Sequence, residues 1–209
     1  MRIAILAAAA ALAAGCFGSL KEPVPQPLVY RIGAPKLAAG APLAADLKID
    51  VGQVAPGLDS SGIATRWPGQ RLDYVAGARW AEELPQLLEA ALVESLQDSG
   101  RLRSVQGDFG RFRVTHTLVV EVRRFEADYT GGGLPVAQVE LTATIGKTDR
   151  RVLASFTVSA SESAAENRQT ALVAALDAAF ARATTELSDR ALGAIGADAA
   201  AQASANIRP

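Results

Sequence analysis

Cysteine and histidine are both scarce in this chain of 209 residues, which contains one of each, Cys16 and His116. A single cysteine has no partner for a disulfide within the chain and excludes a metal site built from several thiolates. A single histidine excludes a site with several imidazole ligands, and a Ser-His-Asp triad would have to use His116. The sequence therefore predicts neither a bound metal ion nor a cofactor.

Positive charge is not in excess either, because 21 Lys and Arg residues stand against 22 Asp and Glu residues, for a formal net charge of -1. A nucleic-acid-binding domain normally carries a basic surface, so we expect no nucleic-acid partner. Hydrophobic residues make up 49% of the chain, and its length suits one domain with a sizeable core.

The N-terminus has the layout of a secretory signal. Arg2 is followed by an almost unbroken stretch of Ala, Leu and Ile that ends at Gly15-Cys16, and this stretch is too short to span a bilayer as a mature helix. The segment from Leu12 to Cys16 resembles the lipobox at which signal peptidase II cleaves. We therefore expect residues 1–15 to be a signal peptide and Cys16 to be lipidated, with an incidental cysteine in an ordinary secretory signal as the alternative.

The residues after Cys16 indicate where the anchor sits. Phe17 and Gly18 stand where lipoproteins retained in the inner membrane commonly carry Asp, so we expect a lipid anchor in the outer membrane, facing the periplasm. Acyl chains contribute about 0.8 kcal/mol per buried methylene, so membrane binding needs neither a basic surface nor a transmembrane helix. Residues 16–27 contain three prolines and are interpreted as a flexible, extended tether.

Alternation of apolar and polar residues predicts a series of strands. The last three of them follow one another with short connections, which indicates an antiparallel meander. The predicted strands are 28–32, 47–51, 63–67, 71–75, 113–129, 137–145 and 152–158.

Two helices are expected between and after these strands. Leucines spaced by three and four residues predict the first over 84–96, with Gly100 as its stop, and Pro85 fits only its first turn or a kink. A capping-box pattern over 163–166 predicts the start of the second, whose apolar stripe continues to Leu187.

This order of elements predicts a single α+β domain over residues 28–192. We expect a mostly antiparallel sheet with the two helices packed on one face. Residues 193–209 contain mainly Ala, Gly and Ser, and are expected to form a disordered tail because they lack apolar bulk.

Residues with recognisable chemistry are few. His116 lies on the apolar side of its strand and is expected to be a hydrogen-bonded structural residue, with a catalytic role as the alternative. The run Gly131 to Gly133 joins two strands and lacks the Lys-Ser/Thr pair of a phosphate loop, so it is interpreted as a hairpin tip, either flexible alone or touching a partner. Trp67 and Trp80 are interpreted as core residues or as part of a contact surface. No catalytic, binding or metal-ligating residue is assigned.

Four short patterns follow one another along the chain. They are Tyr30-Arg31; Ile63-x-x-Arg66 followed by Leu72; Arg79-Trp80-Ala81-Glu82-x-Leu84 at the opening of a helix; and Leu118-x-Val120-x-Val122-x-x-Phe125, followed by two more strands and an Ala-rich helix. In this order they resemble the ABC-type transport auxiliary lipoproteins, the PqiC-like family, over nearly the whole mature chain.

The resemblance implies a protein that acts by binding and has no catalytic residues. Its implied partners are an ABC transporter and a protein with MCE domains, which together move lipids or other hydrophobic molecules between the inner and outer membranes. Formation of a homo-oligomer is left open. The alternative is a lipoprotein that activates a cell-wall synthase or joins a secretion complex, because small α+β domains serve those roles too. A periplasmic hydrolase is a third hypothesis, which the scarcity of catalytic groups disfavours.

Overall fold

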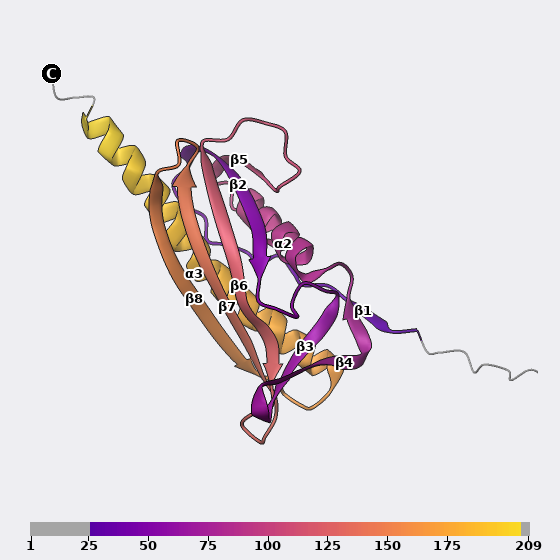
Figure 1. Cartoon of the computed structure of the whole chain (residues 1–209). Helices are drawn as coiled ribbons and strands as arrows, with labels where there is room; N and C mark the ends of the chain where they lie inside the picture. The colour runs from indigo at the N-terminus through magenta and orange to yellow at the C-terminus, as the bar shows by residue number, and fades with distance from the viewer. Residues whose placement is uncertain (1–25, 206–209) are drawn as a thin grey trace, which may run out of the picture.

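The alternating apolar residues build one sheet, and two helices pack against the same face of it (Figure 1). The computed structural model describes residues 26–205, in which eight strands form a single sheet. The predicted signal peptide, 1–15, and Cys16 lie outside these residues. The strands are β1 (Leu28–Tyr30), β2 (Leu43–Val54), β3 (Gly62–Trp67), β4 (Arg71–Trp80), β5 (Leu102–Gln106), β6 (His116–Asp128), β7 (Val136–Lys147) and β8 (Val152–Ser163); the helices are α2 (Leu84–Asp98) and α3 (Gln169–Ala205), with a short 3-10 turn, η2 (Pro68–Gln70).

Strand β6 is the centre of the sheet. One of its edges pairs with β7 in antiparallel fashion and β7 pairs with β8, so the predicted meander is confirmed. The other edge of β6 is shared, because β2 pairs with its first part and β3 with its end, both in parallel. β5 extends the sheet beyond β2, and β4 and β1 extend it beyond β3.

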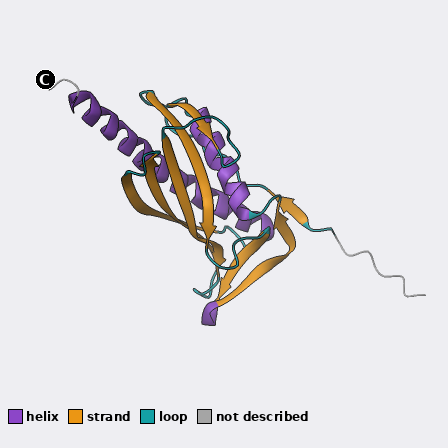
Figure 2. Cartoon of the chain, turned by 45° about the horizontal axis from the view of Figure 1, so that its top comes forward, coloured by secondary structure: helices purple, strands orange, loops and turns teal. Residues whose placement is uncertain are grey.

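The α+β class and the placement of both helices on one face are confirmed, whereas the sheet is mixed (Figure 2). Parallel pairs join β1 to β4, β2 to β5, and both β2 and β3 to β6. Parallel strands need crossover connections. The alternation of apolar and polar residues within one strand does not indicate whether its neighbour runs parallel or antiparallel. Strand β5 was not predicted from the sequence, because only Val105 in it is buried and its apolar pattern is weak.

Helix α2 matches its predicted span closely. Pro85 lies in its first turn, where the missing N–H would have had no partner, and Gly100 follows its end with a φ of 62°. Trp80, however, ends β4 instead of opening the helix, and it is fully packed in the core. Its ring meets Phe125 edge-on at 5.9 Å between centroids, and Phe125 meets Phe180 of α3 at 6.0 Å.

Helix α3 begins later than the capping-box pattern predicts. Ser163 is the last residue of β8 and pairs with Val136, so its backbone belongs to the sheet. The helix starts at Gln169, after a short loop. Pairing with the neighbouring strand therefore overrides the local capping signal.

The end of α3 also differs from the prediction. Residues 193–205, expected to be disordered, continue the helix past Leu192 and project beyond the sheet (Figure 1). Alanine has the highest helix propensity, and Ile195 adds a buried apolar contact. Residues 206–209 lie outside the described part of the chain. Neither helix in residues 26–205 is long and apolar enough to cross a membrane.

Candidate functional site

A pocket of about 290 Å³ lies where the start of β6, the end of β7 and the projecting part of α3 meet. Leu43 and Ile195 contribute apolar walls. Its polar side chains are Thr115, His116, Lys147, Thr148, Asp198 and Gln202.

His116 borders this pocket but is itself buried, as its strand parity predicts. Its Nδ1 lies 2.8 Å from the hydroxyl of Thr115, which also accepts a hydrogen bond from the backbone N–H of Asp46. Its Nε2 is buried and has no hydrogen-bond partner within residues 26–205. Burial, together with the nearby charge of Lys147, lowers the pKa of His116, so the ring is neutral at pH 7.

Asp198 holds the projecting part of α3 against the sheet. Both Lys147 and Arg151 donate to its carboxylate, the latter over 2.5 Å, and the Asp198 side chain is only 8% exposed. Asp198 was not predicted as a site residue, because residues 193–209 were expected to form a disordered tail. The signal that was available is the long run of helix-forming alanines around it.

The described residues of the pocket do not form a triad of nucleophile, histidine and carboxylate. The hydroxyl beside His116 belongs to Thr115 and bonds the backbone of Asp46, while Asp198 is engaged by two cations. A triad needs a base that contacts both a nucleophile and an orienting carboxylate. No group of three or more His, Cys, Asp or Glu side chains within residues 26–205 is placed to hold a metal ion.

A second candidate site lies at the opposite end of the sheet, where the β3–β4 and β6–β7 turns come together (Figure 1). We call it the aromatic end and define it as Trp67, Arg71, Tyr129 and residues 131–133. Trp67 stacks on Tyr129 with 4.4 Å between ring centroids and 5° between planes, and the guanidinium of Arg71 lies 5.1 Å from the Trp67 ring. The stack is partly exposed, so Trp67 belongs to the surface whereas Trp80 belongs to the core.

Charged side chains fix the strands beneath the aromatic end. Arg124 donates to Glu126 and to Asp128, and Arg66 lies 3.7 Å from the same Asp128 carboxylate. The hydroxyl of Tyr129 donates to Asn167, and burial raises the pKa of this tyrosine. These contacts keep the rings in one orientation.

The run of three glycines forms the tip of the β6–β7 hairpin, as the sequence predicts. Gly132 has a φ of 72°, which favours glycine, and a Cβ at any of the three positions would meet nothing within 4 Å. The tip is therefore open, and space alone would permit a partner to approach the Trp67–Tyr129 stack beside it.

Comparison with known proteins gives four findings. The sequence model of the ABC-type transport auxiliary lipoprotein component family matches residues 30–188. An uncharacterized protein of Bradyrhizobium diazoefficiens is 34% identical over 110 residues, which is 52% of this chain but only 29% of the length of that protein. The crystal structure of a Xanthomonas campestris protein of family DUF330 superposes with a TM-score of 0.75 at 29% identity, covering 82% of this chain and 98% of that one. The fold is also shared with the crystal structure of a second uncharacterized protein, at a TM-score of 0.61 and 16% identity.

Proposed function

This chain belongs to the ABC-type transport auxiliary lipoprotein components, and we propose that it serves its transporter by binding other proteins at the outer membrane. The observation that carries the proposal is the family match, which extends from Tyr30, the last residue of β1, into α3 at residue 188 and so includes β2 to β8 and α2 completely. We further propose that the transporter works with a protein of MCE domains and moves lipids between the two membranes. Cys16 would supply the anchor, facing the periplasm.

Binding, rather than catalysis, is supported by the chemistry of the described residues. His116 contacts a threonine and no nucleophile activated by a carboxylate, and its neutral ring lies beneath a small pocket. The partly exposed side chains of the aromatic end, Trp67, Arg71 and Tyr129, are of types that stabilise protein interfaces. Aromatic side chains and arginine are enriched at the residues that contribute most to binding free energy.

The aromatic end is the surface that we propose for the protein partner. It presents the stacked rings of Trp67 and Tyr129 together with the cation of Arg71. The stacking already fixes the orientation of both rings. Because this arrangement exists before binding, little side-chain entropy is lost when the partner docks. The open glycine tip leaves room beside it.

The test is co-purification of the full-length chain from membranes, with quantification of an MCE-domain protein and of the transporter subunits. Trp67→Ala should reduce their recovery several-fold, whereas Val152→Ala, which alters an exposed side chain on β8, should not. Recovery of a peptidoglycan synthase in their place would support the alternative role in cell-wall synthesis. Unchanged recovery with Trp67→Ala would remove the aromatic end from the interface.

A further inference from the structure

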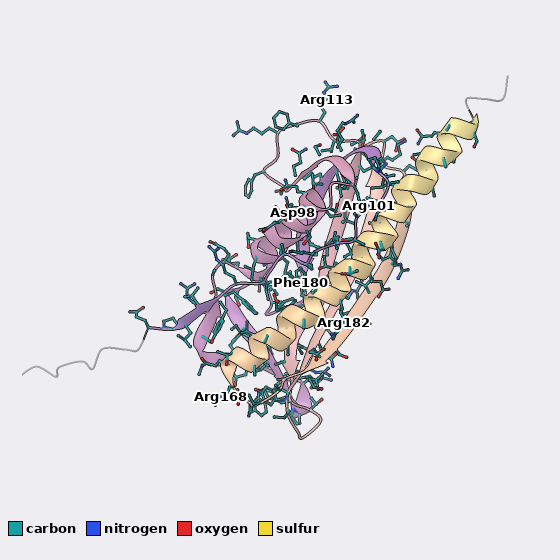
Figure 3. The ribbon with its side chains drawn as sticks, turned by 180° about the vertical axis from the view of Figure 1, so that it is seen from behind. Asp98, Arg101, Arg113, Arg168, Phe180 and Arg182 are labelled. Atoms are coloured by element: carbon teal, nitrogen blue, oxygen red, sulfur yellow. The ribbon has the colours of Figure 1, made fainter. Side chains whose placement is uncertain are left out.

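The loop between β5 and β6, residues 107–115, exposes two phenylalanines to solvent. Phe109 is 90% exposed and Phe112 is 85% exposed, the highest values among the exposed large hydrophobic residues of the described chain. Figure 3 shows the loop standing clear of the sheet and helices, with Arg113 directed away from the body of the molecule. Side chains of this size and polarity are normally withdrawn from water, so their exposure marks a contact surface.

The loop is held in shape by hydrogen bonds at its base. The side chain of Gln106 donates to the carbonyl of Phe112 over 2.8 Å and accepts from the N–H of the same residue. Asp108 forms an ion pair with Lys48 at 2.7 Å, and its N–H donates to Glu89. The fold therefore presents the two rings on a defined support.

The tip of the loop is positively charged as well as aromatic. Arg111 and Arg113 flank Phe112, and neither forms an ion pair within residues 26–205. The one acidic residue of the loop, Asp108, is neutralised by Lys48. Exposed aromatic rings beside unpaired arginines match an anionic lipid surface, where rings enter the headgroup region and cations meet phosphates.

The shape of the tip favours a bilayer over a protein. A standard protein interface buries about 800 Å² on each partner, whereas a buried aromatic side chain contributes about 150–250 Å². Two phenylalanines on a protruding loop offer well under that area. A lipid bilayer is fluid and adapts its shape to a protruding loop, so it needs no preformed complementary surface.

The position of the loop also fits a membrane. In Figures 1 and 2 the loop and β1 both lie away from the β8 edge of the sheet. Leu28 and Val29 of β1 are about half exposed, but β1 and β5 stand at opposite ends of the strand order, so these two residues form a separate apolar surface. The tether from Cys16 to Leu28 can extend only about 40 Å, so an anchored domain stays within reach of the lipid.

We propose that loop 107–115 inserts Phe109 and Phe112 into an anionic phospholipid surface and thereby orients the anchored domain. The inference rests on the anchorage of the proposed function, but it does not depend on which proteins the chain binds. It gives the domain a second point of membrane contact and so fixes the direction in which the aromatic end faces.

The test uses the full-length lipidated chain in vesicles of phosphatidylcholine and phosphatidylglycerol, with Phe112→Trp as a fluorescent probe. Brominated acyl chains should quench the added emission about twofold or more, since quenching requires contact with the bilayer. Leu134→Trp, in the β6–β7 loop at the other end of the sheet, is the matched control and should not be quenched. The chain's own Trp67 and Trp80 supply the constant background.

Flotation of the same vesicles reports the anchor separately from the loop. A chain that floats but whose Phe112→Trp emission is unquenched overturns the proposal. Failure to float would contradict the anchorage alone, and the loop is then measured by sedimentation of the unacylated chain from Phe17 with the same vesicles. That chain keeps every described element of the core.

In this second measurement, the double change Phe109→Ser and Phe112→Ser should lower the bound fraction several-fold, with unchanged circular dichroism. Arg111→Gln with Arg113→Gln should abolish the preference for anionic over neutral vesicles. Equal binding by all variants would overturn the proposal. So would loss of transporter co-purification in the serine variant with no loss of vesicle binding, because the loop would then be a protein interface.

Discussion

The carboxylate of Asp198, near the end of α3, accepts a hydrogen bond over 3.3 Å from the ammonium of Lys147, the last residue of β7. This bond joins the projecting part of the helix to the sheet beside the His116 pocket. Asp198→Ala should therefore lower the free energy of unfolding by about 2 kcal/mol, because it removes charged hydrogen bonds and leaves Lys147 without its partner. Hydrogen exchange should rise over 193–205.

The matched control for Asp198 is Asp189→Ala on the same helix. Asp189 lies 3.8 Å from Arg101 with 64% of its side chain exposed, so its loss should change the stability by less than about 0.5 kcal/mol. Urea unfolding of both variants checks the comparison. Equal effects would show that Asp198 does not fasten the helix.

Replacement of His116 by alanine should affect folding and not activity. The ring is buried and bonded to Thr115, so its truncation should cost about 1–3 kcal/mol through the cavity and the lost hydrogen bond. Complementation of a membrane-permeability defect in a deletion strain, normalised to folded and anchored protein, should be intact. A folded, anchored but inactive His116→Ala protein would reopen the enzyme hypothesis.

Stability should fall when the pH drops below about 6.5, and His116 should contribute to this fall. Its folded-state pKa is lowered by burial and by Lys147, with Asp198 and Asp46 opposing the shift. The unfolded chain then binds the proton more readily, so the contribution is complete above the ordinary pKa and is lost as the pH falls toward the folded one. His116→Gln should lose less stability than the parent between pH 7.5 and pH 5.5 in urea unfolding. Identical losses would assign the pH dependence to other groups.

Asp46 should titrate far below an ordinary aspartate. Hydrogen bonds from Arg103 and then Ser104 lower its pKa to about 2. Arg103→Gln should raise this pKa toward 3.8, since the largest cause of the shift is removed. Carbon NMR of the carboxyl group measures the titration, and Arg123→Gln, whose partner is Glu121, is the control. An unchanged Asp46 titration in Arg103→Gln would contradict the assigned cause.

Cys16→Ala should abolish lipidation and release or mislocalise the protein. The prediction follows from the resemblance of residues 12–16 to a lipobox. Metabolic labelling with an acyl analogue is the measurement, and label retained by the alanine variant would exclude Cys16 as the acceptor.

Periodic patterns in the sequence are sufficient to predict the central strands and α2. The alternation from His116 to Val122 places every second residue on the helix-covered face, and the leucine spacing of α2 does the same on the helix. These signals are local, because each follows from the geometry of one element. The parallel pairing of β5 with β2 depends on residues far apart in the chain and therefore could not be predicted in the same way.

The candidate sites were less predictable than the fold. Phe109 and Phe112 are large apolar residues, which are usually buried. Only the structure shows that the loop exposes both side chains to solvent. Trp67 and Trp80 look equivalent in sequence, yet one stacks at the surface and the other fills the core. Asp198 was not recognised because it lies in a segment of small residues that was expected to be disordered, whereas the segment is helical.

Strand β1 is the first part of the sheet that a pulling force on the N-terminus reaches. It contains three residues and pairs only with β4 in the described sheet, while the hydrogen bond from the N–H of Gly33 to Asp177 fastens the chain just behind it. The next strand begins at Leu43, so detachment of β1 together with loss of the Gly33–Asp177 bond and of the Ile32 packing would release residues 28–42, roughly 50 Å of extended chain. Under the proposed anchorage at Cys16, the connection between anchor and domain would lengthen under tension while the core of the domain stays folded.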